Sequence, residues 1–133
     1  MTRWIGYNDK ASADYFDKYF QDRHLQTRLV KNTDHTEALK LLSTTEYGIN
    51  LVYADYKARL AEMIGMDYEL AKEWNRDYNK LYRELDIVTR FQKFVLDPPN
   101  GVIGGHCVTQ NAHILLKQFP NIMLDLIIDM EQK

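Results

Sequence analysis

The sequence predicts a mainly helical protein with a small strand-helix-strand unit at its N-terminus. Three observations favour this class. Apolar residues recur at helical spacing over most of the chain, two short runs rich in strand-forming residues flank the first helical pattern, and glycine and proline concentrate in residues 98–105. At 133 residues the chain is long enough for one ordinary domain and too short for two.

The first expected elements are two strands around a helix. Residues 3–7 and 27–31 are short runs with apolar side chains, and residues 10–23 carry apolar side chains at helical spacing. This order is that of one βαβ unit. Because one such unit cannot cover both faces of its sheet, we expect the chain to begin inside a longer parent architecture.

The longest helical pattern covers residues 34–64. Asp34 is expected to cap it, with Glu37 three residues on as in a capping box, and Gly65 stands where a C-terminal cap glycine belongs. Apolar residues lie on two faces, so we expect burial on both sides, one of them against a second copy of the chain, and Gly48 permits close packing. The main stripe comprises Ala38, Leu41, Leu42, Thr45, Ile49, Val52, Tyr53, Tyr56, Leu60, Met63 and Ile64.

The rest of the chain predicts three shorter helices around one loop. Asp67 is expected to cap the first of them. The pattern breaks over residues 91–105, which are rich in glycine and proline and indicate a loop. A helix is expected from His106, and after Pro120 a final short helix capped by Asn121.

Composition argues against several classes of protein. The net charge of −2 and the scattered Lys and Arg residues predict no nucleic-acid partner, and the absence of a long apolar run predicts no membrane partner. The single cysteine, Cys107, cannot form an internal disulfide and favours a reducing, cytoplasmic location. There is no G-x-G-x-x-G motif and no P-loop, so no residue can be assigned to cofactor binding.

The sharpest chemical feature is Gly104-Gly105-His106-Cys107 at the start of an expected helix. Glycines let a backbone approach a ligand closely, and the positive end of a helix favours the nucleophilic thiolate. Cys107 is therefore a candidate nucleophile; the alternative is a small buried hydrophobe, the usual role of a lone cysteine. The spacing of His106, Cys107 and His113 fits no common zinc pattern, and a fourth ligand is missing, so we expect no metal site.

Lys40 is a second candidate, because it lies about one turn into an otherwise largely apolar helix. It is either a buried catalytic cation or a lysine whose stem packs at the rim of the helix while its ammonium group stays in water. The sequence pattern leaves both alternatives open.

Residues 37–116 resemble the UDP-glucose/GDP-mannose dehydrogenase family. Residues 37–44 (EALKLLST) are similar to the start of its long central helix, and residues 99–111 (PNGVIGGHCVTQN) to its catalytic-cysteine loop. Residues 3–31 resemble the last βαβ turn of its N-terminal cofactor domain.

The resemblance divides the chain in two. It implies that residues 1–33 are the remnant of the end of a Rossmann-like cofactor domain. Residues 34–133 are then the helical central domain, which serves dimerisation and substrate binding in that family.

The resemblance also implies an NAD-dependent oxidoreductase that converts the C6 alcohol of a nucleotide sugar to the uronic acid through a cysteine thioester. Cys107 matches the nucleophile and Lys40 the lysine that stabilises the oxyanion. Thr44 and Asn111 stand at two further catalytic positions, where the family has Asn and Asp. The residues implied in substrate binding are Gly104, Gly105, His106 and Asn100.

The departures from the family define the alternatives. The neutral amide of Asn111 cannot act as a general base at neutral pH, and most of the NAD domain is missing from the sequence. The first hypothesis is an enzyme core that needs a separate NAD-binding domain. The second is a non-catalytic homodimer, joined through the long helix, that binds a nucleotide sugar or a protein. The third is a structural dimerisation module in which Cys107 is a relic.

Overall fold

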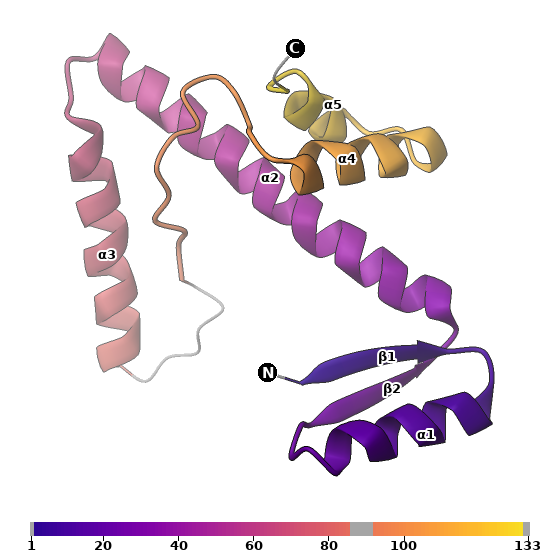
Figure 1. Cartoon of the computed structure of the whole chain (residues 1–133). Coiled ribbons are helices and arrows are strands. Elements are labelled where there is room, and N and C mark those ends of the chain that lie inside the picture. The colour runs from indigo at the N-terminus through magenta and orange to yellow at the C-terminus, as the bar shows by residue number, and fades with distance from the viewer. Residues whose placement is uncertain (1, 86–91, 132–133) are drawn as a thin grey trace. The chain divides into compact units, whose positions relative to one another are not determined.

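A computed structural model of the chain describes residues 2–85 and 92–131 (Figure 1). It confirms the mainly helical class and the small parallel sheet of two strands. The chain divides into two compact units, Met1–Ser43 and Thr44–Lys133. The sequence placed a boundary between residues 33 and 34, whereas these units divide inside a helix.

The first unit is a βαβ motif. Strands β1 (Arg3–Tyr7) and β2 (Thr27–Lys31) pair in parallel, with Arg3 opposite Thr27 and Tyr7 opposite Lys31, and helix α1 (Lys10–Gln21) connects them. Both strands have the bounds that the sequence predicted. A Cβ atom at Gly6 would lie 2.9 Å from the Cα atom of Thr33, so only glycine lets β1 pass this close to the start of the next helix.

Helix α2 (Thr33–Met63) contains 31 residues. The Asn32 side chain accepts a hydrogen bond of 2.9 Å from the backbone N–H of Asp34. The expected cap at Asp34 is therefore wrong: Asp34 lies in the first turn, and the capping side chain comes two residues earlier. The expected C-terminal glycine is confirmed, because Gly65 follows the helix with a φ of +69°.

The buried face of α2 differs from the predicted stripe. Tyr53, Tyr56 and Met63, which were expected inside, have exposed fractions of 58%, 59% and 75%. A Cβ atom at Gly48 would lie only 2.6 Å from Cγ1 of Val108, which confirms the close packing expected at this glycine. The stripe is confirmed in part, because Thr45 is buried and Ile49 and Val52 pack against the apolar core of this unit. The buried positions are Thr45, Gly48, Ala54, Asp55 and Ala61.

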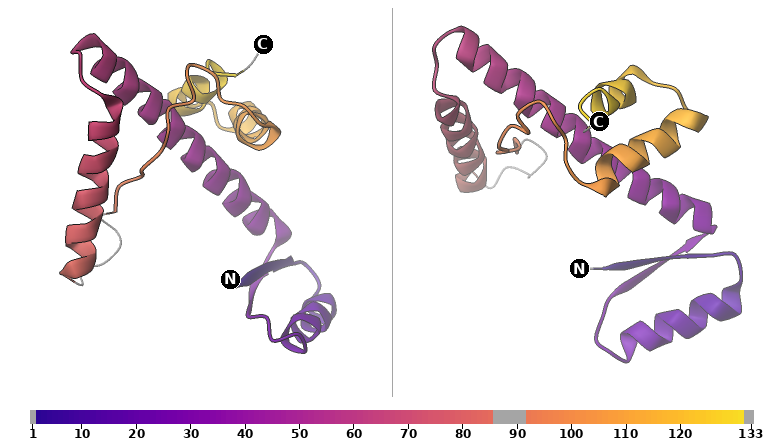
Figure 2. Two further views of the ribbon diagram at one scale, coloured as in Figure 1. Left: turned by 60° about the vertical axis from the view of Figure 1, so that its left-hand side comes forward. Right: turned by 45° about the horizontal axis from the view of Figure 1, so that its top comes forward.

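The rest of the second unit contains α3 (Tyr68–Glu84), α4 (His106–Gln118) and α5 (Ile122–Ile128). The predicted caps Asp67 and Asn121 are confirmed, since each accepts a hydrogen bond from the first turn of its helix. Helices α4 and α5 lie together against one stretch of α2 (Figure 2). The core of this unit is the apolar cluster of Ile103, Val108, Ala112, Leu124, Ile127 and Met130.

Candidate functional site

Cys107 is an exposed thiol in the first turn of α4. The interpretation of Cys107 as a small buried hydrophobe is therefore wrong. Helix α4 begins at His106, as expected, and its cap residue Gly105 offers no side-chain hydrogen bond to the first turn. Backbone N–H groups at an uncapped helix start face water or a ligand, and they favour an anion there.

The glycine loop before Cys107 is open. A Cβ atom added at Gly104 or Gly105 would meet no heavy atom within 4 Å, and Gly105 has a φ of +95°, a conformation that disfavours other residues. The loop is fixed from one side by buried Ile103, whose N–H donates a hydrogen bond of 2.6 Å to the carbonyl of Met130. The loop is thus held at its base and accessible at its glycines.

A small cavity of about 170 Å³ adjoins this loop. It brings together three of the residues predicted to bind substrate, namely Gly104, Gly105 and His106. Ile103, Thr109, Gln110 and Glu131 complete its walls.

Glu131 is a candidate that the sequence analysis missed. Its Oε2 atom lies 2.8 Å from Nε2 of His113, and the hydrogen bonds from His113 and then Thr109 hold the pKa of Glu131 below its usual value. Its backbone pairs with Ile103 in an isolated parallel bridge. No local pattern in the sequence indicates this carboxylate, because it reaches the loop only when the C-terminal segment folds back.

Asn100 lies in the turn that leads to the glycine loop, and it is exposed with a φ of 53°. The next residue, Gly101, donates its backbone N–H to a carboxylate oxygen of Asp55 at 2.8 Å. The other oxygen of the buried Asp55 accepts a hydrogen bond of 2.6 Å from Arg59. Asp55, to which the sequence pattern assigned no role, therefore fixes the turn that carries Asn100.

The remaining predicted residues lie on α2 and α4. Asn111 is half-buried on α4, about one turn beyond Cys107, and Thr44 is half-buried on α2. Lys40 belongs to the first unit, where it is exposed and borders a cavity of about 620 Å³ together with Trp4. The alternative of a buried Lys40 is therefore wrong.

Side chains of α3 hold the backbone of the segment that precedes the glycine loop. The amide of buried Asn79 accepts a hydrogen bond from the N–H of Lys93 and donates one to its carbonyl, both at 2.7 Å. Asn75 donates to the carbonyl of Phe94 at 2.8 Å. These side-chain amides satisfy backbone groups of a segment that belongs to no helix or strand.

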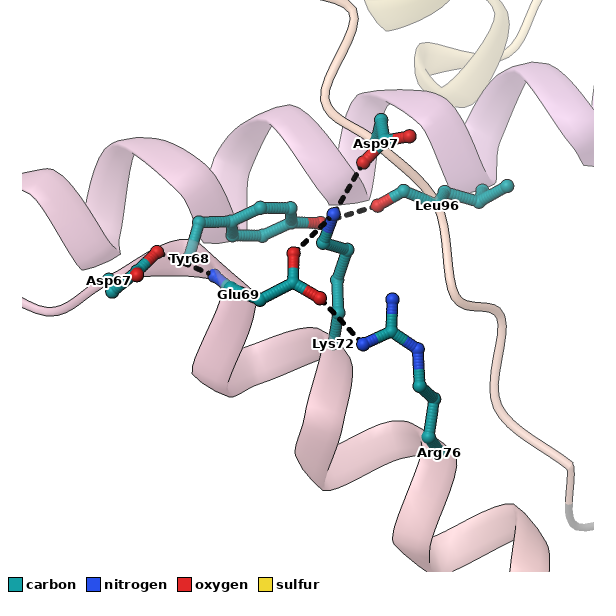
Figure 3. A network of polar contacts seen from close by, with 7 residues as sticks. All are labelled: Asp67, Tyr68, Glu69, Lys72, Arg76, Leu96 and Asp97. Atoms are coloured by element: carbon teal, nitrogen blue, oxygen red, sulfur yellow. Dashed lines mark hydrogen bonds and ion pairs between the residues drawn. The ribbon is translucent and has the colours of Figure 1, made fainter.

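Polar contacts extend along the same face of α3 (Figure 3). The hydroxyl of Tyr68 donates to the carbonyl of Leu96 at 2.9 Å, and burial raises the pKa of Tyr68. Lys72 Nζ lies 2.6 Å from carboxylate oxygens of Asp97 and Glu69, and these partners, Asp97 first, raise the pKa of Lys72. The ammonium group of Lys72 is therefore paired on both sides.

Comparison with family models, with curated proteins and with solved structures yields no match. Within residues 2–85 and 92–131, no three His, Cys, Asp or Glu side chains are grouped as a metal site. None of the helices in these ranges combines the length and apolarity required to cross a membrane.

Proposed function

We propose that residues 34–133 form the helical central domain of a nucleotide-sugar 6-dehydrogenase-like oxidoreductase, with Cys107 as its nucleophile. The observation that carries this proposal is the exposed thiol in the first turn of α4, separated by His106 alone from two glycines with open space beside them. An exposed thiol is accessible to a substrate carbonyl. The resemblance of residues 37–116 to the family supports the assignment of the substrate class.

The step assigned to Cys107 is addition to an aldehyde at C6 of the sugar. The thiolate sulfur forms a bond to the carbonyl carbon, and the π electrons move to the oxygen, which takes a proton to give a thiohemiacetal. The uncapped N–H groups at the start of α4 are the groups proposed to stabilise the developing oxyanion.

The residues of the first unit do not fit NAD. In a Rossmann unit the pyrophosphate lies at the N-terminus of the helix that follows a strand. Here the N–H groups of Ala11 and Ser12 donate to the carboxylate of Asp9, at 3.2 and 2.8 Å. Hydrogen bonds from Ser12 and then Ala11 also lower the pKa of Asp9, so a negative charge already occupies this position. We therefore assign NAD to a separate NAD-binding domain.

The homodimer is proposed to form through the exposed apolar side of α2. Tyr56, Leu60 and Met63 follow at helical spacing and are all exposed, with stacking of Tyr56 on Tyr53 at a centroid distance of 6.1 Å. A stripe of large apolar residues that the described chain does not cover is typical of an interaction surface. A two-fold pairing of α2 with its copy would bury it.

Asn111 favours a second candidate function, a non-catalytic module for dimerisation or nucleotide-sugar binding. It is a neutral amide, about one helical turn beyond Cys107, at the position where the family has a carboxylate that activates water. An amide cannot accept the proton of water in that step. The second candidate keeps the sugar-binding loop and the dimer but has no hydrolysis of a thioester.

The test is the alkylation rate of Cys107 by iodoacetamide in the presence of a panel of UDP- and GDP-sugars. The proposal predicts that one sugar nucleotide slows alkylation at least several-fold. The corresponding sugar nucleotide with an aldehyde at C6 is then expected to give a thiohemiacetal detected by mass spectrometry, absent in Cys107→Ser. Protection without the adduct selects the binding module. Equal alkylation rates under all conditions would overturn both candidates that bind sugar and leave the structural scaffold.

A further inference from the structure

A second cavity, of about 330 Å³, lies in the second unit between α2, α3 and the segment 93–96. It shares no lining residue with the cavity at the glycine loop. Its volume is at the lower end of the range for small-molecule sites, about 300–1,000 Å³. The walls are formed by Asn50, Tyr53, Ala54, Lys57, Asn75, Lys93, Phe94 and Leu96.

Two lysines, Lys57 and Lys93, give this cavity its charge, and none of the described residues that line it is a carboxylate. In the described parts of the chain neither lysine forms an ion pair with a carboxylate, in contrast to Lys72, which contacts both Glu69 and Asp97. Burial, and then the positive charge of Lys93, lower the pKa of Lys57. Two ammonium groups that repel each other at one cavity are stabilised when an anion binds between them.

The cavity is also built to receive a flat apolar group. Tyr53 and Phe94 both line it, and their exposed fractions of 58% and 53% show that the core does not bury these side chains. The ammonium group of Lys57 lies 5.3 Å from the ring centroid of Tyr53. The aromatic ring offers a flat surface to a planar ligand, and the cation beside it attracts the negative charge of that ligand.

Three side chains of α3 fix this arrangement before any ligand binds. The backbone of Lys93 is held on both its N–H and its carbonyl by Asn79, and its ammonium group lies 3.8 Å from the ring centroid of Tyr78. Asn75 holds the carbonyl of Phe94. A site whose lining residues are already positioned loses less entropy on binding.

We propose that this cavity binds a small phosphorylated molecule. The phosphate monoester lies between the ammonium groups of Lys57 and Lys93, and the planar body attached to it lies against Tyr53 and Phe94. A phosphate monoester carries close to two negative charges at neutral pH, which matches the two cations better than a carboxylate does.

The test is calorimetric titration of the full chain with phenyl phosphate, compared with inorganic phosphate and with phenol. Phenyl phosphate is expected to bind, phenol not measurably, and inorganic phosphate more weakly than phenyl phosphate. Lys57→Gln and Lys93→Gln are each expected to weaken phenyl phosphate binding by about tenfold or more, the effect of one charge-assisted hydrogen bond. The matched control is Lys80→Gln, which removes an exposed lysine of α3 that pairs with Glu84 and should leave binding within about twofold.

Absence of phenyl phosphate binding, or equal affinity of the two variants and the intact chain, would overturn the proposal. Equal affinity for inorganic phosphate and phenyl phosphate would overturn the role given to Tyr53 and Phe94. A measurement on the unsubstituted chain guards against misfolded variants: the NMR signal of the Lys57 ammonium nitrogen should shift with phenyl phosphate and not with phenol. An unchanged Lys57 signal at saturating phenyl phosphate contradicts the site.

Discussion

Two neighbouring stretches of the chain, residues 93–101 and residues 104–107, are held in opposite ways. The backbone of the first is bonded to side chains of α2 and α3, through Asn79, Asn75 and Asp55 among others. The second has open space beside both glycines and ends at an exposed thiol. The chain therefore uses polar side chains of α2 and α3 to fix the approach to α4, and it leaves the two glycines just before α4 without neighbouring side chains.

The largest effect is expected from breaking the anchored stretch at Asn79. Asn79→Leu removes two hydrogen bonds and leaves the N–H and carbonyl of Lys93 without these partners. We expect a loss of about 3 kcal/mol in the free energy of unfolding, since each such group costs about 1–3 kcal/mol when it is buried and unpaired. Urea unfolding followed by circular dichroism measures it.

The matched control for Asn79 is Asn75→Leu on the same face of α3. Asn75 makes one hydrogen bond to this segment, with the carbonyl of Phe94, and is less buried. Its loss should cost about 1 kcal/mol. Equal losses for the two variants would show that the paired contact of Asn79 does not anchor the segment.

Asp55 gives the next effect, because it anchors the far end of the same stretch. Asp55→Ala removes the acceptor for the N–H of Gly101 and the partner of Arg59, at a cost of about 2 kcal/mol in unfolding free energy. Arg59→Ala removes only the ion pair, whose arginine is 68% exposed, and should cost below about 1 kcal/mol. If thermal unfolding shows the arginine variant to be the less stable of the two, Asp55 acts through the ion pair and not through the turn.

The open stretch should tolerate side chains but not a change of backbone conformation. Gly104→Ala and Gly105→Ala both add a methyl group into open space, and only Gly105 has a positive φ. We expect Gly105→Ala to cost about 1–2 kcal/mol and Gly104→Ala to change stability by less than about 0.5 kcal/mol. Calorimetric melting of the pair measures this difference, and equal melting temperatures would contradict a constraint specific to Gly105.

The same comparison explains what could be predicted from the sequence. Local signals located the strands, the caps Asp67 and Asn121, and the start of α4 at His106, because capping and strand patterns act within a few residues. Apolar spacing predicted part of the buried face of α2, at Thr45, Ile49 and Val52, but it could not predict the close contact that Gly48 makes with α4.

The residues around the site show the same limit. Gly104, Gly105 and Cys107 were found because they are adjacent in sequence and carry recognisable chemistry. Asp55 and Glu131 were missed, because each reaches its partner from a distant part of the chain through tertiary folding. Sequence spacing along one helix contains no information on such pairings.

The smallest effect concerns a side-chain contact beside the open loop, the one between Glu131 and His113. The pKa of Glu131 is lowered from 4.5 in the folded chain, chiefly by the hydrogen bond with His113. Its contribution to stability is therefore fully present above pH 4.5 and is lost as the pH falls through the lower pKa of the folded state.

We expect Glu131→Gln to be less stable than the unsubstituted chain at pH 6, and the difference to shrink steadily below pH 4.5 in urea unfolding. Glu69 also has a lowered pKa, so Glu69→Gln serves as the control. When Glu69→Gln is introduced into both chains, the stability difference between Glu131→Gln and the parent should stay the same. A difference between Glu131→Gln and the parent that stays constant from pH 6 to the acid limit of folding would mean that the loop is held by the backbone contact of Ile103 alone.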